Sequence, residues 1–258
     1  MINFNFSLTQ VQMFLLAFLR VSAIIATVPP LNSRNIPVMF KAGLAFTISM
    51  ILFPILNLED IPFFIDTISF GIKVLSEIML GIMIGLSVRL LFAGIQLAGQ
   101  LAGYQMGFAI VNVMDTLSSN QVSIIAQFHT ITSMLIFFCI NAHHWILRAL
   151  VESFQIVPPF SFQFTNSIME QLMRLTSNMF VIAIKLGAPV IVALLLTTVA
   201  LGLIARTVPQ MNVFIVAFPL KIVVGLVFLA LSLPYFLSFL KQIFNGMGND
   251  IIQLLKAV

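Results

Sequence analysis

Residues 68–102 read ISFGIKVLSEIMLGIMIGLSVRLLFAGIQLAGQLA, an apolar run that only a few polar side chains interrupt. No alternating strand pattern appears in it, and backbone groups in lipid must be hydrogen-bonded internally, so we expect a helix. About 35 helical residues would extend roughly 50 Å, whereas the hydrocarbon core of a bilayer is about 30 Å thick. The segment therefore has to tilt, project beyond the membrane, or break.

Glycines recur along this run and offer possible break points. They are Gly71, Gly81, Gly85, Gly94, Gly99 and Gly103. The pairs Gly81-x-x-x-Gly85 and Gly99-x-x-x-Gly103 permit close approach between helices. We expect these glycines to fit neighbouring helices of the same chain.

The composition of the whole chain agrees with a membrane location. Of the 258 residues, 60% are apolar and 8% are charged, whereas globular domains have about 25% charged residues. These values exclude a soluble enzyme and a disordered chain. The net charge is +4, but the basic residues are scattered singly, which excludes a nucleic-acid-binding patch. No basic residue precedes the first apolar run, so we expect no cleaved signal peptide, and the single Cys139 predicts no internal disulfide.

Further apolar runs predict additional helices on both sides of the quoted stretch. They span residues 8–28, 37–58, 122–140, 144–157, 178–205 and 211–240. The predicted fold is all-α: a multi-helix integral membrane protein in which long, broken helices form hairpins. Trp and Tyr number only one and two against 26 Phe, a weak interfacial belt that indicates protein contact over much of the apolar surface.

Charged residues lie inside several of these runs, where each costs about 2.5–3.5 kcal/mol at the bilayer centre. Lys73 and Glu77 are four residues apart and can pair on one helix face. Arg20, near the end of its run, can extend to the interface. Lys185 and Lys221 have no local partner, so each needs another helix, another subunit or a wet cavity.

The segment 103–121, GYQMGFAIVNVMDTLSSNQ, is the longest stretch that is neither strongly apolar nor charged. We expect a loop between two helices. Its Met and Phe residues are poorly suited to free solvent, and the flexible thioether chains can pack adaptably. We therefore expect this loop to fold into a protein-lined cavity.

No residue pattern predicts catalysis, a cofactor or a metal site. His143 and His144 are adjacent and point about 100° apart on a helix, so they do not form a chelating pair. The stretch 245–250, NGMGND, follows no strand and is interpreted as a hinge between two apolar helices. A membrane-embedded hydrolase would need facing acid–base groups, and His129 and His143 have no evident acidic partner.

Four motifs, in the same order along the chain, resemble those of the FliR family, which includes flagellar proteins and their counterparts in virulence-associated type III secretion. Residues 209–221, PQMNVFIVAFPLK, resemble its signature P-Q-x-N-x-F-x-x-G-F-P-L-K, and residues 103–115 resemble its G-x-Q-x-G-F…D-P segment. The two other matches are Pro30-Leu31, Arg34, Ile36-Pro37 and Lys41, and residues 141–144 followed by Ser153-Phe154 and Pro158. Ala142 and Ala217 replace the family's usual glycines, and Thr116 replaces its proline.

The resemblance implies an export-gate subunit of the bacterial inner membrane and flagellar basal body. Residues 1–165 would be a FliP-like helical part and residues 166–258 a FliQ-like helical hairpin with a tail. The chain would join FliP and FliQ around a pore for unfolded flagellar proteins, with FlhB and FlhA docked beneath. It also implies that the loop corresponding to 103–121 plugs the closed pore.

Two sets of candidate site residues follow from this reading. The predicted plug contains Gln105, Met106, Gly107, Phe108, Met114 and Asp115, and the predicted subunit contacts are Phe218, Pro219, Lys221, Lys73 and Glu77. The alternative function is a multi-pass small-molecule transporter or channel subunit, which helices broken at Pro189 and Pro219 would suit, although no internal repeat supports it. The sequence leaves a flagellar and a virulence-type system both open.

Overall fold

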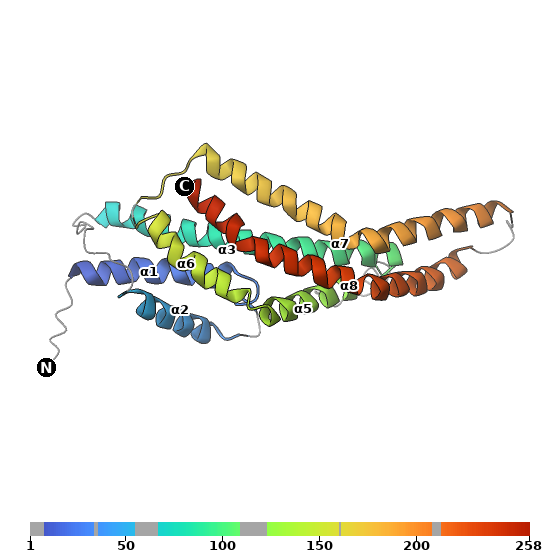
Figure 1. Ribbon diagram of the computed structural model, residues 1–258, viewed down its shortest axis with the longest axis horizontal. Helices are drawn as coiled ribbons and strands as arrows, with labels where there is room; N and C mark the ends of the chain where they lie inside the picture. The colour runs from blue at the N-terminus through green and yellow to red at the C-terminus, as the bar shows by residue number, and fades with distance from the viewer. Residues whose placement is uncertain (1–7, 34–35, 55–66, 109–122, 160, 208–212) are drawn as a thin grey trace. The chain divides into compact units, whose positions relative to one another are not determined.

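The computed structural model describes residues 8–33, 36–54, 67–108, 123–159, 161–207 and 213–258 (Figure 1). Within these ranges the chain forms seven helices and no strand, which confirms the all-α prediction. The helices are α1 (Leu8–Thr27), α2 (Val38–Leu52), α3 (Thr67–Met106), α5 (Ile124–Cys139), α6 (His143–Ile156), α7 (Asn166–Thr207) and α8 (Val213–Lys256). Each corresponds to one of the predicted apolar runs.

Four of these helices, α1, α3, α7 and α8, are long and apolar enough to cross a membrane, and α5 with α6 adds a fifth span if the bent pair is counted. The glycines of α3 do not break it, so this 40-residue helix runs beyond the length of a single upright span. These helices agree with a multi-pass membrane protein.

The predicted hinge at 245–250 is wrong, because α8 continues through this stretch to Lys256. Its buried residues recur at helical spacing: Phe244, Met247, Ile251 and Leu254 are each at most 1% exposed. This apolar stripe stabilises the helix more than Gly246 and Gly248 weaken it, since each glycine costs about 0.5–1 kcal/mol.

The chain divides into two compact units that interleave along the sequence. Unit 1 comprises Met1–Leu90, His143–Leu175 and Gly246–Val258, and unit 2 comprises Leu91–Ala142 and Thr176–Asn245. Helices α3, α7 and α8 contribute to both units. These units are defined by compactness. The predicted boundary between residues 165 and 166 instead separates a FliP-like part from a FliQ-like part, and it stays a prediction.

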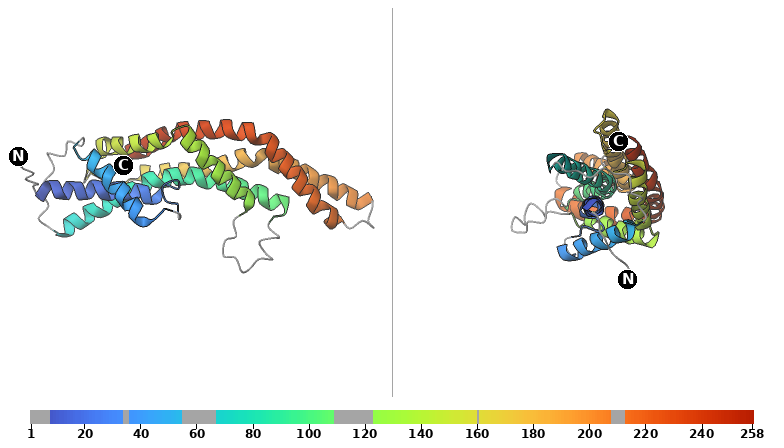
Figure 2. Two further views of the ribbon diagram at one scale, coloured as in Figure 1. Left: turned by 90° about the horizontal axis from the view of Figure 1, so that it is seen from below. Right: turned by 90° about the vertical axis from the view of Figure 1, so that its left-hand side faces the viewer.

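In unit 1, α1 packs closely on α3 through the first predicted glycine pair, and α2 lies beside α1 (Figure 2). A Cβ atom at Gly81 would lie 2.6 Å from the Cβ of Ala23 and 2.7 Å from the carbonyl oxygen of Arg20. A Cβ atom at Gly85 would lie 2.5 Å from that of Thr27. The glycines therefore serve helix packing within the chain, as expected.

In unit 2, the second glycine pair brings α3 against the start of α5. A Cβ atom at Gly99 would lie 2.5 Å from the Cα of Ala126. A core of Ala102, Met106, Ile125, Val190 and Leu194 joins α3, α5 and α7. Residues of α7 and α8 beyond this core form an antiparallel pair in both views (Figures 1 and 2).

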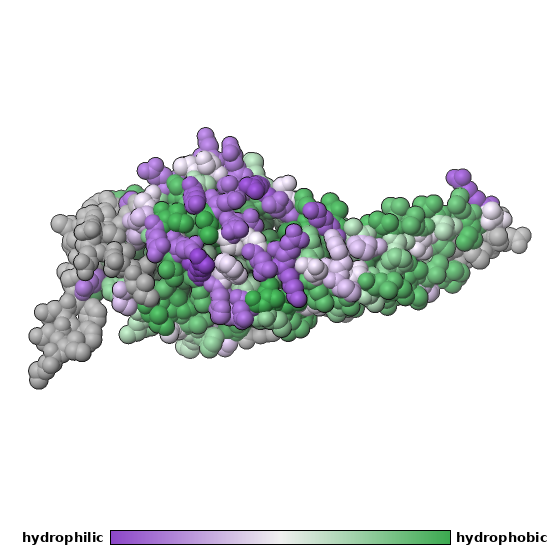
Figure 3. All heavy atoms as spheres, viewed as in Figure 1, coloured by the Kyte–Doolittle hydropathy of each residue, from purple (hydrophilic) through white to green (hydrophobic). Residues whose placement is uncertain are grey.

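The outer surface of this α7–α8 pair is strongly apolar (Figure 3). Large apolar side chains there are exposed, among them Leu196 (62%), Leu203 (60%) and Ile215 (70%). A surface of this kind is expected to contact lipid or other protein rather than water.

We expect Gly81→Ala to destabilise unit 1, because the new methyl group meets the backbone of α1, which cannot move independently of the helix. Gly71→Ala is the matched control, since nothing lies within 4 Å of a Cβ atom there. It should raise stability by about 0.5–1 kcal/mol, the usual gain from Gly to Ala in a helix. Thermal unfolding midpoints of the purified variants in detergent measure both effects. Equal shifts for the two variants would contradict the close α1–α3 packing.

Candidate functional site

The segment 103–121, predicted to be a loop, begins inside α3, because the helix continues to Met106. Residues Gly103–Met106 form the last helical turn, and the helix ends at Gly107. Gln105 is exposed, Met106 is fully buried and Phe108 is half-buried. Met114 and Asp115 lie outside the described residues. The part of the predicted plug that the structure describes is thus a helix end anchored in unit 2.

Gly107 ends α3 through its backbone conformation. Its φ is +93°, in the left-handed region that glycine adopts without strain. The Gly107 N–H donates to the Tyr104 carbonyl at 3.1 Å, and the Phe108 N–H donates to the Gly103 carbonyl at 3.1 Å. This is the Schellman arrangement, which satisfies the free carbonyls of a helix end. In the sequence, a glycine followed by an apolar residue at the end of an apolar run indicates this arrangement. This pattern could have been used to predict the end of α3 at Gly107.

The end of α3 is held against α8 by two contacts. The side chain of Met106 fills the space where Gly225 lacks one, since a Cβ atom there would lie 2.6 Å from the Met106 Cε and Cγ atoms. A Cβ atom at Gly107 would lie 3.0 Å from the Cδ1 of Phe218. Residues from the predicted plug therefore contact one of the predicted subunit-contact residues within this chain.

Beside Phe218, a cavity of about 410 Å³ lies between the distal parts of α7 and α8. Its lining is mostly small or apolar, and comprises Thr198, Leu201, Gly202, Ala205, Ala217, Phe218 and Lys221. Lys221 is half-buried at its wall, and Pro219 lies exposed within α8. The predicted contact residues of the 209–221 motif thus lie at an open groove that a neighbouring side chain can enter.

In unit 1, Arg20 is fully buried, so the expectation that it extends to the membrane interface is wrong. Its Nε atom donates to Glu77 Oε2 at 2.6 Å, and both side chains are 0% exposed. Its Nη1 and Nη2 atoms donate to the Val157 carbonyl, each at 3.1 Å, and Nη1 also donates to the Ser153 carbonyl at 2.9 Å. The guanidinium lies 4.1 Å from the Phe154 ring centroid.

This arrangement explains why Arg20 is inside. A buried carboxylate compensates its charge, and it caps the carbonyls at the end of α6. Glu77, one of the predicted subunit contacts, is thereby bonded within the chain, and Lys73 is half-buried one turn before it. The sequence signal that was missed is a pair of opposite charges on different apolar helices, α1 and α3.

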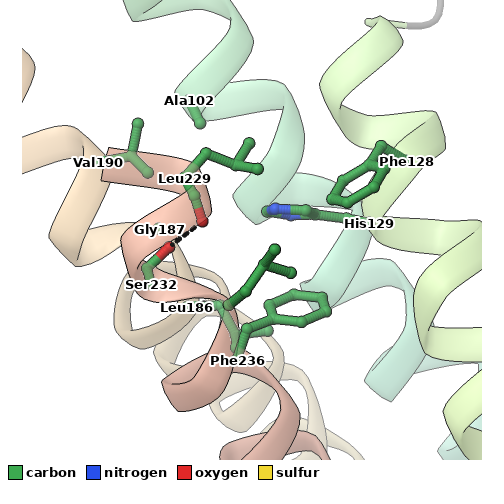
Figure 4. Close-up of a pocket in the computed structure, with 10 residues that line it drawn as sticks. Ala102, Phe128, His129, Leu186, Gly187, Val190, Leu229, Ser232 and Phe236 are labelled. Carbon is green, nitrogen blue, oxygen red and sulfur yellow. Dashed lines mark hydrogen bonds between the residues drawn. The ribbon is translucent and has the colours of Figure 1, made fainter. Parts of the chain in front are cut away.

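His129, which the sequence presents only as an acid–base candidate without an acidic partner, borders a small cavity in unit 2 (Figure 4). Its ring packs on Phe236 with centroids 4.7 Å apart, and it hydrogen-bonds to the backbone of Ile95. Its Nδ1 atom is buried without a hydrogen-bond partner. The nitrogen-bearing end of the ring points toward Leu229 and Ser232 (Figure 4), and the Ser232 hydroxyl donates to the Leu229 carbonyl at 2.9 Å. The cavity measures about 10 Å³, the space of about one water molecule.

The residues around His129 do not form an acid–base site. No carboxylate or cysteine lines its cavity. Among the described residues, no group of three His, Cys, Asp or Glu side chains is placed to hold a metal ion. The arrangement suits a bound water and the packing of α5 against α8.

Comparisons with known proteins agree with the four motifs. The family described as "Bacterial export proteins, family 1" matches residues 11–247. The chain is 34% identical to the flagellar biosynthetic protein FliR of Bacillus subtilis, with 90% of each chain covered. It is 32% identical to FliR of Pectobacterium carotovorum, over 95% of this chain and 93% of the relative. With FliR of Escherichia coli the identity is 30%, over 97% of each chain.

Removing one partner of the buried ion pair should lower the stability of the protein more than removing both. Arg20→Met removes the cation that is bonded to the buried Glu77 carboxylate, and breaking a buried ion pair in this way typically costs about 3–5 kcal/mol. Replacing both residues, as in Arg20→Met with Glu77→Leu, removes that penalty and should recover much of the stability. Membrane yield and thermal unfolding midpoints measure the effect. The exposed pair Arg148 and Glu152 gives a control, because Arg148→Met should change stability little. A double variant no more stable than Arg20→Met would contradict a paired charge.

The contact between Met106 and Gly225 predicts a rescue. Gly225→Val should destabilise unit 2, because the new side chain occupies the space of the Met106 Cγ and Sδ atoms. Met106→Ala removes those atoms, so the combined variant should be more stable than Gly225→Val alone. Gly202→Val is the matched control, since a Cβ atom there meets nothing within 4 Å. Unfolding midpoints of the four variants test the contact, and additive losses would argue against it.

Proposed function

The chain belongs to the FliR family of bacterial export proteins and is a component of a flagellar export apparatus. From this premise we propose that it builds and seals the membrane pore through which unfolded flagellar proteins are exported. It would act without catalysis of its own, in the bacterial inner membrane within the flagellar basal body. Its partners in the proposal are FliP and FliQ around the pore and FlhA and FlhB beneath it.

The observation that carries the proposal is that two of the family-like motifs contact each other. Gly107 of the 103–115 motif lies against Phe218 of the 209–221 motif, and Met106 is locked beside Gly225. These two contacts hold the end of α3, from which residues 109–122 follow, at a fixed position on α8. A plug has to be tethered in this way if it is to close a pore repeatedly without being lost from it.

The chemistry of this segment supports sealing. A constriction of flexible, apolar Met and Phe side chains resists ion flow and still deforms around a passing chain. The groove beside Lys221 and Phe218 supports a contact with a neighbouring subunit, because its small residues leave room for an inserted side chain. A solute transporter gains less support, since α7 and α8 continue through Pro189 and Pro219 and are not broken there.

The plug is tested by replacing residues 109–121 with a Gly-Ser linker of equal length while keeping Met106–Phe108. We expect a several-fold increase in ion leak across the membrane, because the variant loses Met114 and the aliphatic side chains of residues 110–117. Co-purification with FliP and FliQ should be unchanged, because the anchor on α8 is intact. Gln105→Ala, an exposed change in the same turn of α3, is the control and should not leak.

Two results would reject parts of this proposal. The plug role would be rejected if the linker variant assembles and its ion leak is no greater than that of the unmodified protein. Failure of the unmodified chain to co-purify with FliP and FliQ would remove the shared pore.

A further inference from the structure

A second groove lies along the α7–α8 pair of unit 2, with a volume of about 500 Å³. Its α7 wall runs from Lys185 to Leu196, and its α8 wall includes Phe228 and Tyr235. Between these ends the lining is apolar, and Val192, Leu196 and Phe228 are 55%, 62% and 40% exposed. The groove thus opens on the apolar surface of the unit.

The polar groups of the groove gather at one end. Because α7 and α8 run antiparallel here, Lys185 at the beginning of the α7 wall lies level with Tyr235 at the end of the α8 wall. Tyr235 stacks on Phe239, with centroids 5.8 Å apart, and the Lys185 ammonium lies 5.9 Å from the same ring. A lysine beside a tyrosine is the arrangement that proteins place at the level of lipid headgroups.

Lys185 requires an anion that the described part of the chain does not supply. Among the described residues, no carboxylate forms an ion pair with Lys185. Its helix is apolar on both sides, and an uncompensated ammonium in such surroundings is unfavourable. The backbone there is also incomplete, because Pro189 has no N–H to donate to the Lys185 carbonyl four residues earlier. The same end of the groove therefore offers a cation and an acceptor.

The length of the groove matches one leaflet of a bilayer. From Lys185 to Leu196 the helix rises about 16 Å, and half of the hydrocarbon core is about 15 Å. An acyl chain that begins at the level of Lys185 would reach the far end of the apolar wall.

We propose that this groove binds an anionic phospholipid with a hydroxylated headgroup. The phosphate contacts the Lys185 ammonium and the Tyr235 hydroxyl, a headgroup hydroxyl donates to the Lys185 carbonyl, and one acyl chain lies along Val192 and Leu196. One molecule thereby satisfies the charge, the backbone acceptor and the apolar wall together. The proposal requires a membrane location only and is independent of the pore and its plug.

Native mass spectrometry of the full chain in detergent tests the site. The chain is titrated with phosphatidylglycerol and with phosphatidylcholine of the same acyl chains. Lys185→Gln should weaken phosphatidylglycerol binding about fivefold, the contribution of one lysine near an anionic lipid, and leave phosphatidylcholine binding unchanged. Val192→Trp fills the groove and should weaken both. Lys241→Gln removes an exposed lysine of α8 outside the groove and should change neither.

Three results would overturn the proposal. One is equal binding of the two lipids by the unmodified chain, and another is equal loss for Lys185→Gln and Lys241→Gln. The third comes from a photoreactive residue placed at Val192 in cells that contain FliP and FliQ. Crosslinks to lipid support the site, whereas crosslinks to another protein would assign the groove to a partner helix. Ion leak, which tests the pore proposal, does not enter these measurements.

Discussion

The buried bond between Arg20 and Glu77 is the constraint on which the arrangement of unit 1 depends. Neither side chain has access to water, so the bond between them compensates each charge for its burial. The guanidinium also caps the end of α6 through the Ser153 and Val157 carbonyls. One side chain of α1 thus determines where α3 and α6 must lie. The glycines at 81 and 85 let α1 approach α3 closely enough for the bond to form.

Hydropathy predicted the helices well because burial in an apolar environment, with or without lipid, selects the same long apolar runs. It failed where tertiary packing determines whether a helix continues or where a charged side chain lies. The stretch 245–250 carries two glycines and reads as a hinge, yet Met247 and its helical neighbours are buried and keep α8 continuous. Arg20 reads as an interfacial residue because a single sequence does not reveal that Glu77, on another helix, will face it. Long-range pairs of this kind become visible only in three dimensions.

The candidate site was predictable in part. The plug assigned to the motif at 103–115 stays a prediction, and the first four residues of the motif are helical, because α3 packs on α5 and α8 up to Met106. Gly107 was placed in the predicted plug, and the structure shows that its left-handed backbone ends the helix. The contact with Phe218 joins segments about a hundred residues apart in the chain, and local residue spacing carries no information about such a contact. The sequence presented His129 only as an acid–base candidate without an acidic partner. Its cavity could not be predicted for the same reason, since the other walls come from α3, α7 and α8.

The basic residues of the apolar helices separate into two classes, and the separation indicates what each surface is for. Arg20 has a planar group with several donors, and the chain satisfies it internally with a carboxylate and backbone carbonyls. Lys185 and Lys221 carry compact ammonium groups at open grooves, and no ion pair among the described residues includes them. A charge such as that of Arg20, which groups of the same chain compensate, stabilises the fold. A charge left at an open apolar groove is available to an anion outside the chain, and this availability is what the two contacts proposed for the α7–α8 surface use.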